Sequence, residues 1–372
     1  MILQFRCPPD LKAKVDELVK KGLYPDFSTF CLVALENQLL LEDGAALPSQ
    51  RREEFKDERA GDRKRAAGIA SSRRGVAAPR PARVNGIPQE VMLSQVPDVA
   101  PLALREHVAS VFSPAAAVPV NRWLLGHYNR LFPAKVSCRA LVNLSKNGKA
   151  SIVLDEIAPL ISEVAAQVGG YLRALDAELK SHRDDSLSIA FPEPGDGGAK
   201  GRLRYQNHFV GHMVKGQQEG LLVGLKLAVL EVKRNRPVIL PTHAGWAFAR
   251  LPNPILDGDS NQPQPLGEQE IEFLLGHIQQ SVPVELFAYK LLLSLIGRGH
   301  DTPESTNQGL MEYVDAAKLS GDVEVYIATQ RGGVLGRMKD LQLIHRERIG
   351  TSFRYHVSDR GAAFLARVGE VQ

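Results

Sequence analysis

The sequence predicts a mainly α-helical protein with short β elements, arranged as a small N-terminal module, a linker and two related C-terminal domains. Three observations predict this arrangement. Residues 1–43 carry a short apolar strand pattern followed by two helical patterns, whereas residues 44–95 are poor in apolar side chains. Residues 96–372 contain an internal repeat with a spacing of 116 residues. A chain of 372 residues is long enough for two or three folding units.

The amino-acid composition is not that of an extreme class of protein. The distribution of charge along the chain is more informative about binding partners than the net charge. Apolar residues make up 44% of the chain and charged residues 24%, which is ordinary for a globular protein, and the net charge is only +4. Lys and Arg nevertheless outnumber Asp and Glu by 11 to 5 between residues 51 and 83, by 8 to 2 between 200 and 236, and by 8 to 3 between 329 and 367. Such concentrations are typical of a surface that binds a polyanion.

Residues 44–95 are expected to form a disordered basic linker. They are rich in Ala, Arg, Ser, Gly and Pro and contain few aromatic residues. A segment of this composition cannot bury enough apolar surface to offset the entropy lost on ordering. A flexible basic tether would also hold the domains that it joins close to a common target.

Hydrophobic periodicity from residue 96 onward predicts mainly helices. The expected helices cover residues 102–112, 120–131, 138–144, 154–180, 205–215, 269–279, 283–296 and 303–313. Short strands are expected at residues 225–232 and 238–240, with another possible strand at 187–191. Residues 328–368 are expected to form a helix, a hairpin and a second helix.

The internal repeat becomes visible when the sequence is shifted by 116 positions. The pairs that then coincide are Gly216 with Gly332, Gly220 with Gly336, Leu225 with Leu341, Leu227 with Leu343, Glu231 with Glu347, Thr242 with Ser358, Gly245 with Gly361 and Phe248 with Phe364. The shared pattern is Leu-x-Leu, a basic hairpin, a strand and then Thr/Ser-x-x-Gly-x-x-Phe. Its length without a gap predicts a duplicated domain, with boundaries at residues 96–257 and 258–372.

The first 43 residues combine a strand with two helices. Ile2–Pro8 is the strand pattern, an amphipathic helix runs to about Lys21, and Gly22 suits a helix end. Ser28 is the natural N-cap of a second helix over residues 29–41. One short strand and two short helices cannot enclose a core alone, so two chains are expected to pair. This order and spacing resemble the ribbon-helix-helix superfamily of DNA-binding repressors.

The resemblance implies a homodimer on double-stranded DNA. Alternate strand residues of that family face the major groove, which here points to Ile2, Gln4 and Arg6. Gln can bond adenine and Arg can bond guanine, while Ile offers only apolar contact to a thymine methyl. The start of the second helix, at Ser28 and Thr29, would hold a phosphate. The alternative is a module that only dimerises, which its 5 basic and 7 acidic residues favour.

The C-terminal block resembles a winged helix-turn-helix domain. A helix beginning near Thr329 carries Gln330, Arg331, Arg337 and Lys339, and suits insertion into the major groove. The following hairpin carries Arg346, Arg348 and Arg354, which can reach phosphates or the adjacent minor groove. Winged helices also serve as protein-interaction modules, so a protein partner remains open for this block.

The first copy of the repeat is a less typical winged helix. Its predicted recognition helix begins with Arg202 and Arg204, and continues through Gln206 and Asn207. Its hairpin turn is Lys233-Arg234-Asn235-Arg236, of which Arg234 and Arg236 are the predicted DNA contacts. A structural or dimerising role is the alternative for this copy.

No cofactor, metal or catalytic motif is expected. The glycine-rich run at residues 195–201 lacks the Gly-Lys-Ser/Thr ending of a nucleotide-binding loop. His208 and His212 lie one helical turn apart, but the sequence offers no third zinc ligand. Cys7, Cys31 and Cys138 are too scattered for disulfides. With neither a signal peptide nor a long apolar run, the expected location is the cytoplasm, in association with the nucleoid.

These patterns together predict a sequence-specific DNA-binding protein without enzymatic activity. The preferred function is a dimeric transcriptional regulator of a composite operator. One alternative is a replication, partition or DNA-architecture factor of a mobile element, because tandem winged helices resemble those of plasmid initiators. Another is an adaptor whose winged helices bind a protein such as a nuclease or helicase.

Overall fold

The computed structural model describes most of the C-terminal part of the chain and four positions near its N-terminus. The described residues are 12, 15, 16, 20, 87–98, 104–106, 117–145, 152–181, 185–214, 217–258, 263–315, 322–350 and 352–369. The chain divides into two compact units, Met1–Arg80 and Pro81–Gln372. In the first unit the four described residues are helical, with Val15 buried and Lys12, Asp16 and Lys20 exposed. The predicted amphipathic first helix is confirmed at these positions.

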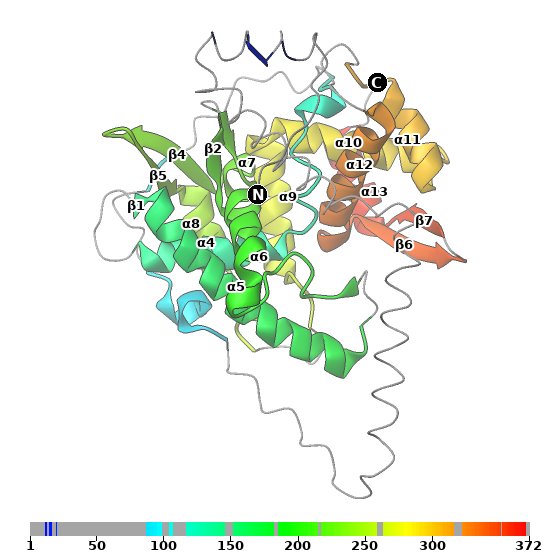
Figure 1. The fold of residues 1–372 in the computed structure, drawn as a ribbon. Coiled ribbons are helices and arrows are strands. Elements are labelled where there is room, and N and C mark those ends of the chain that lie inside the picture. The colour runs from blue at the N-terminus through cyan, green and yellow to red at the C-terminus, as the bar shows by residue number, and fades with distance from the viewer. Residues whose placement is uncertain are drawn as a thin grey trace, which may run out of the picture. The chain divides into compact units, whose positions relative to one another are not determined.

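The second unit is mainly helical and contains three small sheets (Figure 1). Its α-helices are α4 (Phe132–Leu144), α5 (Leu154–Leu179), α6 (Ala199–Tyr205), α7 (Leu221–Gly224), α8 (His243–Arg250), α9 (Glu268–Ser281), α10 (Pro283–Gly297), α11 (Pro303–Met311), α12 (Val323–Asp340) and α13 (Asp359–Val368). Short 3-10 helices are η2 (Gln89–Val91), η3 (Leu93–Gln95), η4 (Val120–Arg122) and η6 (Asp196–Gly198), and η7 (Gln206–Val210) is a π-helix.

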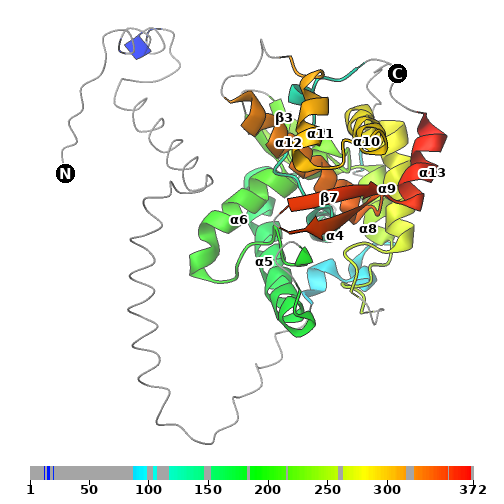
Figure 2. The same cartoon turned by 90° about the vertical axis from the view of Figure 1, so that its right-hand side faces the viewer.

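The strands pair as antiparallel hairpins. β4 (Ala228–Lys233) pairs with β5 (Arg236–Pro241), which also pairs with the two-residue β1 (Ile152–Val153). β6 (Ile344–Ile349) pairs with β7 (Ser352–Val357), and β2 (His212–Val214) with β3 (Gln217–Glu219). In Figure 1 the β4–β5 hairpin extends to the upper left of this unit and β6–β7 to the right. Figure 2 turns that right-hand side toward the viewer and brings β7 to the front.

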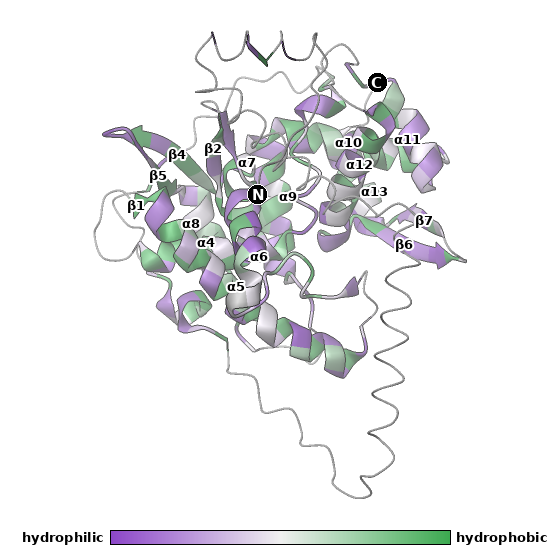
Figure 3. Ribbon diagram, in the orientation of Figure 1, coloured by the Kyte–Doolittle hydropathy of each residue, from purple (hydrophilic) through white to green (hydrophobic). Residues whose placement is uncertain are grey.

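One hydrophobic core runs through the second unit, from Val91 to Phe364. Helix α10 lies within it, since nearly every residue from Leu286 to Ile296 is buried. Its sequence is apolar on all sides, as a fully buried helix requires. The two predicted C-terminal domains therefore share one core rather than forming separate globules. Figure 3 shows the hydrophobic interior helices and the hydrophilic outer end of the β4–β5 hairpin.

Helix α4 joins the two halves through buried cations. The Lys135 ammonium donates to the carbonyls of Phe248 and Leu251 at 2.6 and 2.7 Å, and contacts the Glu270 carboxylate of α9 at 2.8 Å. These carbonyls belong to the end of α8, where a helix leaves its last C=O groups unpaired and attracts positive charge. Burial lowers the pKa of Lys135 to about 8.

Several sequence predictions are confirmed, with small shifts in the boundaries. Helices predicted at 154–180, 269–279, 283–296 and 303–313 correspond to α5, α9, α10 and α11. Helix 138–144 is longer than expected and begins at Phe132, because Pro133 occupies its first turn, where a missing N–H costs nothing. The last block has the expected order of helix, hairpin and helix. The helix predicted at 102–112 lies almost entirely outside the described residues.

Other predictions are wrong. Residues 120–131 form only the three-residue η4 and an irregular segment, since the turn at Gly126 packs against α12 instead of continuing a helix. The helix predicted at 205–215 stops at Val210, because Gly211 adopts a φ of 151° and a hairpin follows. Residues 187–190 form turns, and residue 191 does not belong to a strand.

The predicted linker is also too long at its C-terminal end. Residues 87–95 form the turns η2 and η3, and Val91 is fully buried. Asn143 and Arg139 of α4 donate to the carbonyls of Glu90 and Val91 at 2.6 and 2.8 Å. These contacts stabilise a segment whose composition alone indicated disorder. The prediction failed because the partners of these contacts lie far away in the sequence.

Candidate nucleic-acid interface

The 116-residue repeat is present as two matching hydrogen-bonded frames. Thr242 caps α8, its Oγ accepting from Gly245 N at 3.0 Å and donating to Lys226 O at 2.8 Å. Ser358 caps α13 in the same way, accepting from Gly361 N at 2.9 Å and donating to Gln342 O at 2.6 Å. The backbone N–H groups of Thr242 and Ser358 donate to Leu227 O and Leu343 O, again 116 positions apart.

Each frame holds a hairpin in the same register. Ala228 pairs with Pro241 at the base of β4–β5, and Lys233 pairs with Arg236 at its tip. The bounds of β6 and β7 follow from those of β4 and β5 by adding 116, and Ile349 pairs with Ser352 at the tip. Arg234 and Asn235 form the first turn with φ values of 51° and 60°, as a two-residue hairpin turn requires. We call these hairpins the first wing and the second wing.

The first wing ends in exposed basic side chains. Arg234 and Arg236 are exposed, and Lys233 is half-buried. Arg236 contacts Glu156 of α5 at 3.1 Å, but its side chain stays 53% exposed. Lys233 and Arg105 both contact Glu231, at 3.4 and 2.8 Å. Since exposed ion pairs contribute little free energy, a phosphate can displace the carboxylate beside Arg236.

The second wing has a similar charge and more histidine. Arg348 and Arg354 are exposed, whereas Arg346 is half-buried above the Phe353 ring, 4.4 Å from its centroid. Arg354 contacts Asp301 at 3.2 Å with 48% of its side chain exposed. His345 and His356 are also exposed, and the prediction from sequence did not include them.

Helix α12 does not present the surface that the sequence predicts. The prediction for Arg337 is wrong: its side chain is fully buried, and its Nε and Nη2 lie 2.5 and 2.9 Å from the Glu285 carboxylate of α10. The prediction for Gln330 is also wrong, since only 2% of this residue is exposed and its amide nitrogen donates to Tyr326 Oη. Arg331 is half-buried and donates to Pro303 O and Asn307 Oδ1.

The cause is a segment that crosses α12. A Cβ added to Gly333 would lie 2.2 Å from Gly126 O, and one added to Gly336 would lie 2.3 Å from Asn129 O. Residues 123–131, which we call the strap, therefore lie directly on this face of the helix. Tyr128 O also accepts from Arg337. Among the four predicted base readers of this helix, Lys339 keeps a 30% exposed side chain, and it contacts Asp185.

The strap contacts the first copy at the equivalent place. Tyr128 Oη accepts from Gly220 N at 2.9 Å, and Leu124 packs against Gly224. Gly220 and Gly336 are partners in the 116-residue repeat, so one segment contacts the same turn of both copies. Gly336 is thus explained by close approach of the strap rather than by DNA, whereas Gly220 has a φ of 121° and an added Cβ there would lie 2.5 Å from Gly211 Cα.

The predicted readers of the first copy are spread over α6 and η7. Arg204 is exposed, while Arg202 has a 20% exposed side chain that donates to Gly195 O at 2.6 Å. Gln206 and Asn207 are half-buried in the π-helix, and Gln206 donates to Ser162 Oγ at 2.9 Å. Among these four residues, Arg204 is the one with an exposed side chain. The structure therefore does not present the four predicted readers together on one exposed surface.

The structure describes only some of the remaining predicted residues. Ile2, Gln4, Arg6, Ser28 and Thr29 lie outside the described residues, as do Cys7 and Cys31. Cys138 is buried and free. His208 stacks on His127 with ring centroids 5.5 Å apart. The described residues hold no group of three or more His, Cys, Asp or Glu arranged for a metal ion.

Sequence reasoning missed the buried charged residues and the strap. Lys135, Arg139, Glu270 and Glu285 are fully buried, although their residue types indicate surface positions. The spacing of Lys135 and Arg139, one turn apart on a helix rich in buried apolar residues, was the available signal.

Comparisons with protein-family models, with curated proteins and with solved structures found no match for this chain. Within the described ranges, no helix combines the length and the apolar character needed to cross a membrane.

Proposed function

We propose that this chain is a non-enzymatic, sequence-specific DNA-binding protein that acts as a dimeric regulator. In this proposal residues 1–43 pair two chains and read bases through Gln4 and Arg6. The two wings of each second unit bind phosphates through Arg234, Arg236, Arg348 and Arg354. Arg204 and Lys339 supplement the wings.

A single observation carries the proposal: two hairpins built on the same frame both carry exposed arginines. The frames agree in caps and register, while the sequences of the strands differ. What the two copies share on their exposed side is cationic charge. Arginine on a rigid hairpin is suited to phosphate, because its planar group bonds two oxygens at once.

The burial of Gln330 and Arg337 changes which elements we assign to base reading and which to phosphate contact. A winged helix usually reads bases through its third helix, whose counterpart here is α12. Since the strap covers α12, we assign base reading to the N-terminal strand and phosphate contact to the wings. Several weak contacts on one dimer give tight binding through multivalency.

The same burial favours a second candidate, an adaptor that touches DNA only through residues 1–43. In that case the wings would bind a protein, and their arginines would meet acidic side chains. A role in replication or partition is a third reading, favoured by two related domains on one core.

Selection of bound fragments from random-sequence DNA, followed by sequencing, separates these functions. The full-length protein is expected to recover a palindromic element, since a two-fold dimer reads two half-sites. Direct repeats with local melting would instead support an initiator. If the protein retains no fragment at moderate salt, the DNA-binding proposal fails and the adaptor is favoured.

A further inference from the structure

Two histidines and an arginine lie together where the strap meets the first copy of the repeat. The rings of His127 and His208 stack with their centroids 5.5 Å apart and their planes 14° from parallel. His127 is exposed on the strap, and His208 is half-buried in η7. Arg204 precedes His208 by four residues where η7 continues α6, and side chains at this spacing lie on one face of a helix. We call these three side chains the histidine cluster.

The histidine cluster is built on fixed elements. The Tyr128 ring meets the His208 ring edge-on, with centroids 6.0 Å apart. Tyr128 is buried, and its Oη accepts from Gly220 N at 2.9 Å. Gly211 N donates to Gln206 O, five positions back, so the helix is a π-helix at the place where it carries His208. Turns of this kind recur at functional sites.

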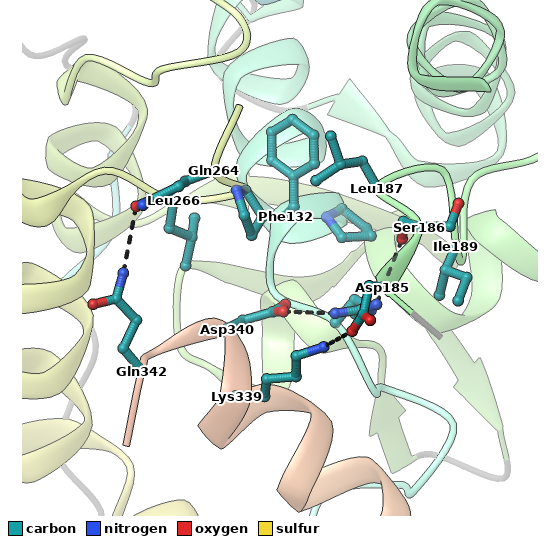
Figure 4. A pocket seen from close by; sticks show the side chains of 13 residues that line it. Phe132, Asp185, Ser186, Leu187, Ile189, Gln264, Leu266, Lys339, Asp340 and Gln342 are labelled. Atoms are coloured by element: carbon teal, nitrogen blue, oxygen red, sulfur yellow. Dashed lines mark hydrogen bonds and ion pairs between the residues drawn. The ribbon is translucent and has the colours of Figure 1, made fainter. Parts of the chain in front are cut away.

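Arg204 differs from other cations of the second unit in having no acidic partner. It is exposed, and within the described ranges it makes neither an ion pair nor a hydrogen bond. Arg202 on the same helix contacts Glu163 at 3.6 Å, and Figure 4 shows Lys339 directed at Asp185. An arginine without such a partner can bind an anion without first losing an ion pair.

The acidic groups around the histidine cluster are directed at other cations. His212 of β2 is engaged at both ring nitrogens, since Nδ1 lies 3.1 Å from Asn207 O and Nε2 lies 3.4 Å from the Glu219 carboxylate of β3. Helices α4 and α5 pack against η7, and charged side chains on them are paired as follows: Glu163 with Arg202, Lys135 with Glu270 and Arg139 with Asp257. The exposed side of His127 and Arg204 therefore faces no carboxylate in these pairs.

In the free protein both imidazoles are mostly neutral at pH 7. Burial, and then Arg204, lowers the pKa of His127. Burial, and then His127, Arg204 and His212, lowers the pKa of His208 to about 4. Two stacked imidazolium ions would repel each other, so the pair takes up one proton rather than two. An anion beside His127 favours the protonated ring and hence the uptake of that proton.

We propose that Arg204 and His127 bind one backbone phosphate of DNA, and that the stacked histidines take up a proton when this phosphate binds. The inference rests on the proposed function and adds to it a phosphate contact on the strap, outside both wings. It also sets the response to pH. Because the complex holds one proton more than the free protein, the affinity for DNA rises as the pH falls.

Fluorescence anisotropy of the full-length protein on the selected duplex, at pH 8 and pH 6 and constant ionic strength, tests the proton uptake. Uptake of one proton changes affinity by at most tenfold per pH unit, so we expect the wild type to bind about threefold to tenfold more tightly at pH 6. His127→Gln is expected to lose most of this difference and to change binding little at pH 8. The matched control is His243→Gln, because His243 is an exposed histidine on α8.

The comparison of variants decides, since His345 and His356 of the second wing can also take up protons as the pH falls. His243→Gln should keep the pH dependence of the wild type. The inference is overturned if His127→Gln keeps it too.

A second variant tests the phosphate contact separately from the proton. Arg204→Gln is expected to lower the slope of log affinity against log salt by about 1 at both pH values, because one phosphate contact is lost. A wild-type slope for Arg204→Gln would overturn the inference while the duplex is still bound, and the proposed function would stand. If the wild type binds no duplex at either pH, the proposed function fails and this inference fails with it.

Discussion

At the scale of single residues, the pair Arg337–Glu285 is the clearest case of a side chain whose role depends on its surroundings. Both carboxylate oxygens of Glu285 accept from the Arg337 guanidinium, and both side chains are fully buried. Tyr289 lies beside them, and burial raises the pKa of its hydroxyl well above the ordinary value. An arginine in such a place stabilises packing of α12 on α10 and is not available to DNA.

Removing one charge of this pair should lower the free energy of unfolding far more than replacing both side chains with apolar ones. Glu285→Gln leaves the guanidinium buried with a neutral partner, and we expect the free energy of unfolding to fall by about 3–5 kcal/mol. The double variant Glu285→Leu/Arg337→Met should recover most of this loss, since neither charge then remains buried. Urea denaturation of the single and double variants measures both values. A double variant that is less stable than Glu285→Gln would contradict this account.

His208 predicts the response to acid. Burial, and then the nearby charges of His127, Arg204 and His212, lower its pKa to about 4. Between pH 6.5 and 4 the unfolded chain takes up a proton that the folded chain does not, so the free energy of unfolding falls as the pH falls. Above pH 6.5 this histidine contributes no pH dependence.

The measurement is urea denaturation at pH 7 and pH 5. The wild type should lose more stability between these pH values than His208→Asn does. The control is His356→Asn, because that histidine is exposed on the second wing and contacts Glu347. Equal pH dependence of His208→Asn and the wild type would show that His208 is not the responsible group.

At the scale of elements, the packing of a short helix on each wing explains why both copies of the repeat have a glycine after the helix cap. A Cβ added to Gly245 would lie 2.0 Å from Leu227 O, and one added to Gly361 would lie 2.1 Å from Leu343 O. The short helix after each wing therefore packs directly on the backbone that begins the hairpin. The repeat Thr/Ser-x-x-Gly describes this contact.

Gly245→Ala and Gly361→Ala should each lower the free energy of unfolding, by about 1–3 kcal/mol, because the added methyl forces backbone to move. Gly276→Ala is the control, since that glycine lies inside α9 with no atom near its added Cβ, and it should raise stability by about 0.4–1 kcal/mol. Thermal unfolding of the three variants decides. If neither Gly245→Ala nor Gly361→Ala lowered the stability, the two frames would be less tightly packed than these contacts indicate.

The wings could be predicted from sequence and the strap could not, for a physical reason. Hairpins and caps depend on neighbours in the chain, so Thr242, Gly245 and the basic turn at Arg234 carry a readable pattern. The strap depends on contacts more than 200 residues apart, such as Tyr128 with Arg337. Residue type indicated that the face of α12 that carries Gln330 and Arg337 is exposed, because arginine and glutamine usually lie on the surface.

At the scale of the whole molecule, the two copies share a core, and this core fixes the wings relative to each other. The buried cations of α4 and the strap both contact each half of the unit. Two wings held in this way would present arginines to DNA without further ordering, which reduces the entropic cost of binding. Pairing through residues 1–43 would double the number of wings.

The salt dependence of DNA binding tests this account most directly. Fluorescence anisotropy on the selected duplex would be measured for the wild type, for Arg234→Ala/Arg236→Ala and for Arg348→Ala/Arg354→Ala. The control variant is Arg122→Ala/Lys180→Asn, which removes two exposed charges outside the wings and keeps a residue suited to the φ of 53° at position 180. Each phosphate contact contributes about 0.9 to the slope of log affinity against log salt.

We predict that each wing variant lowers the slope by up to about 2 while the preferred sequence stays the same, and that the control leaves the slope unchanged. Wing variants that bind with the slope of the wild type would contradict the assignment of phosphate contacts to the two hairpins.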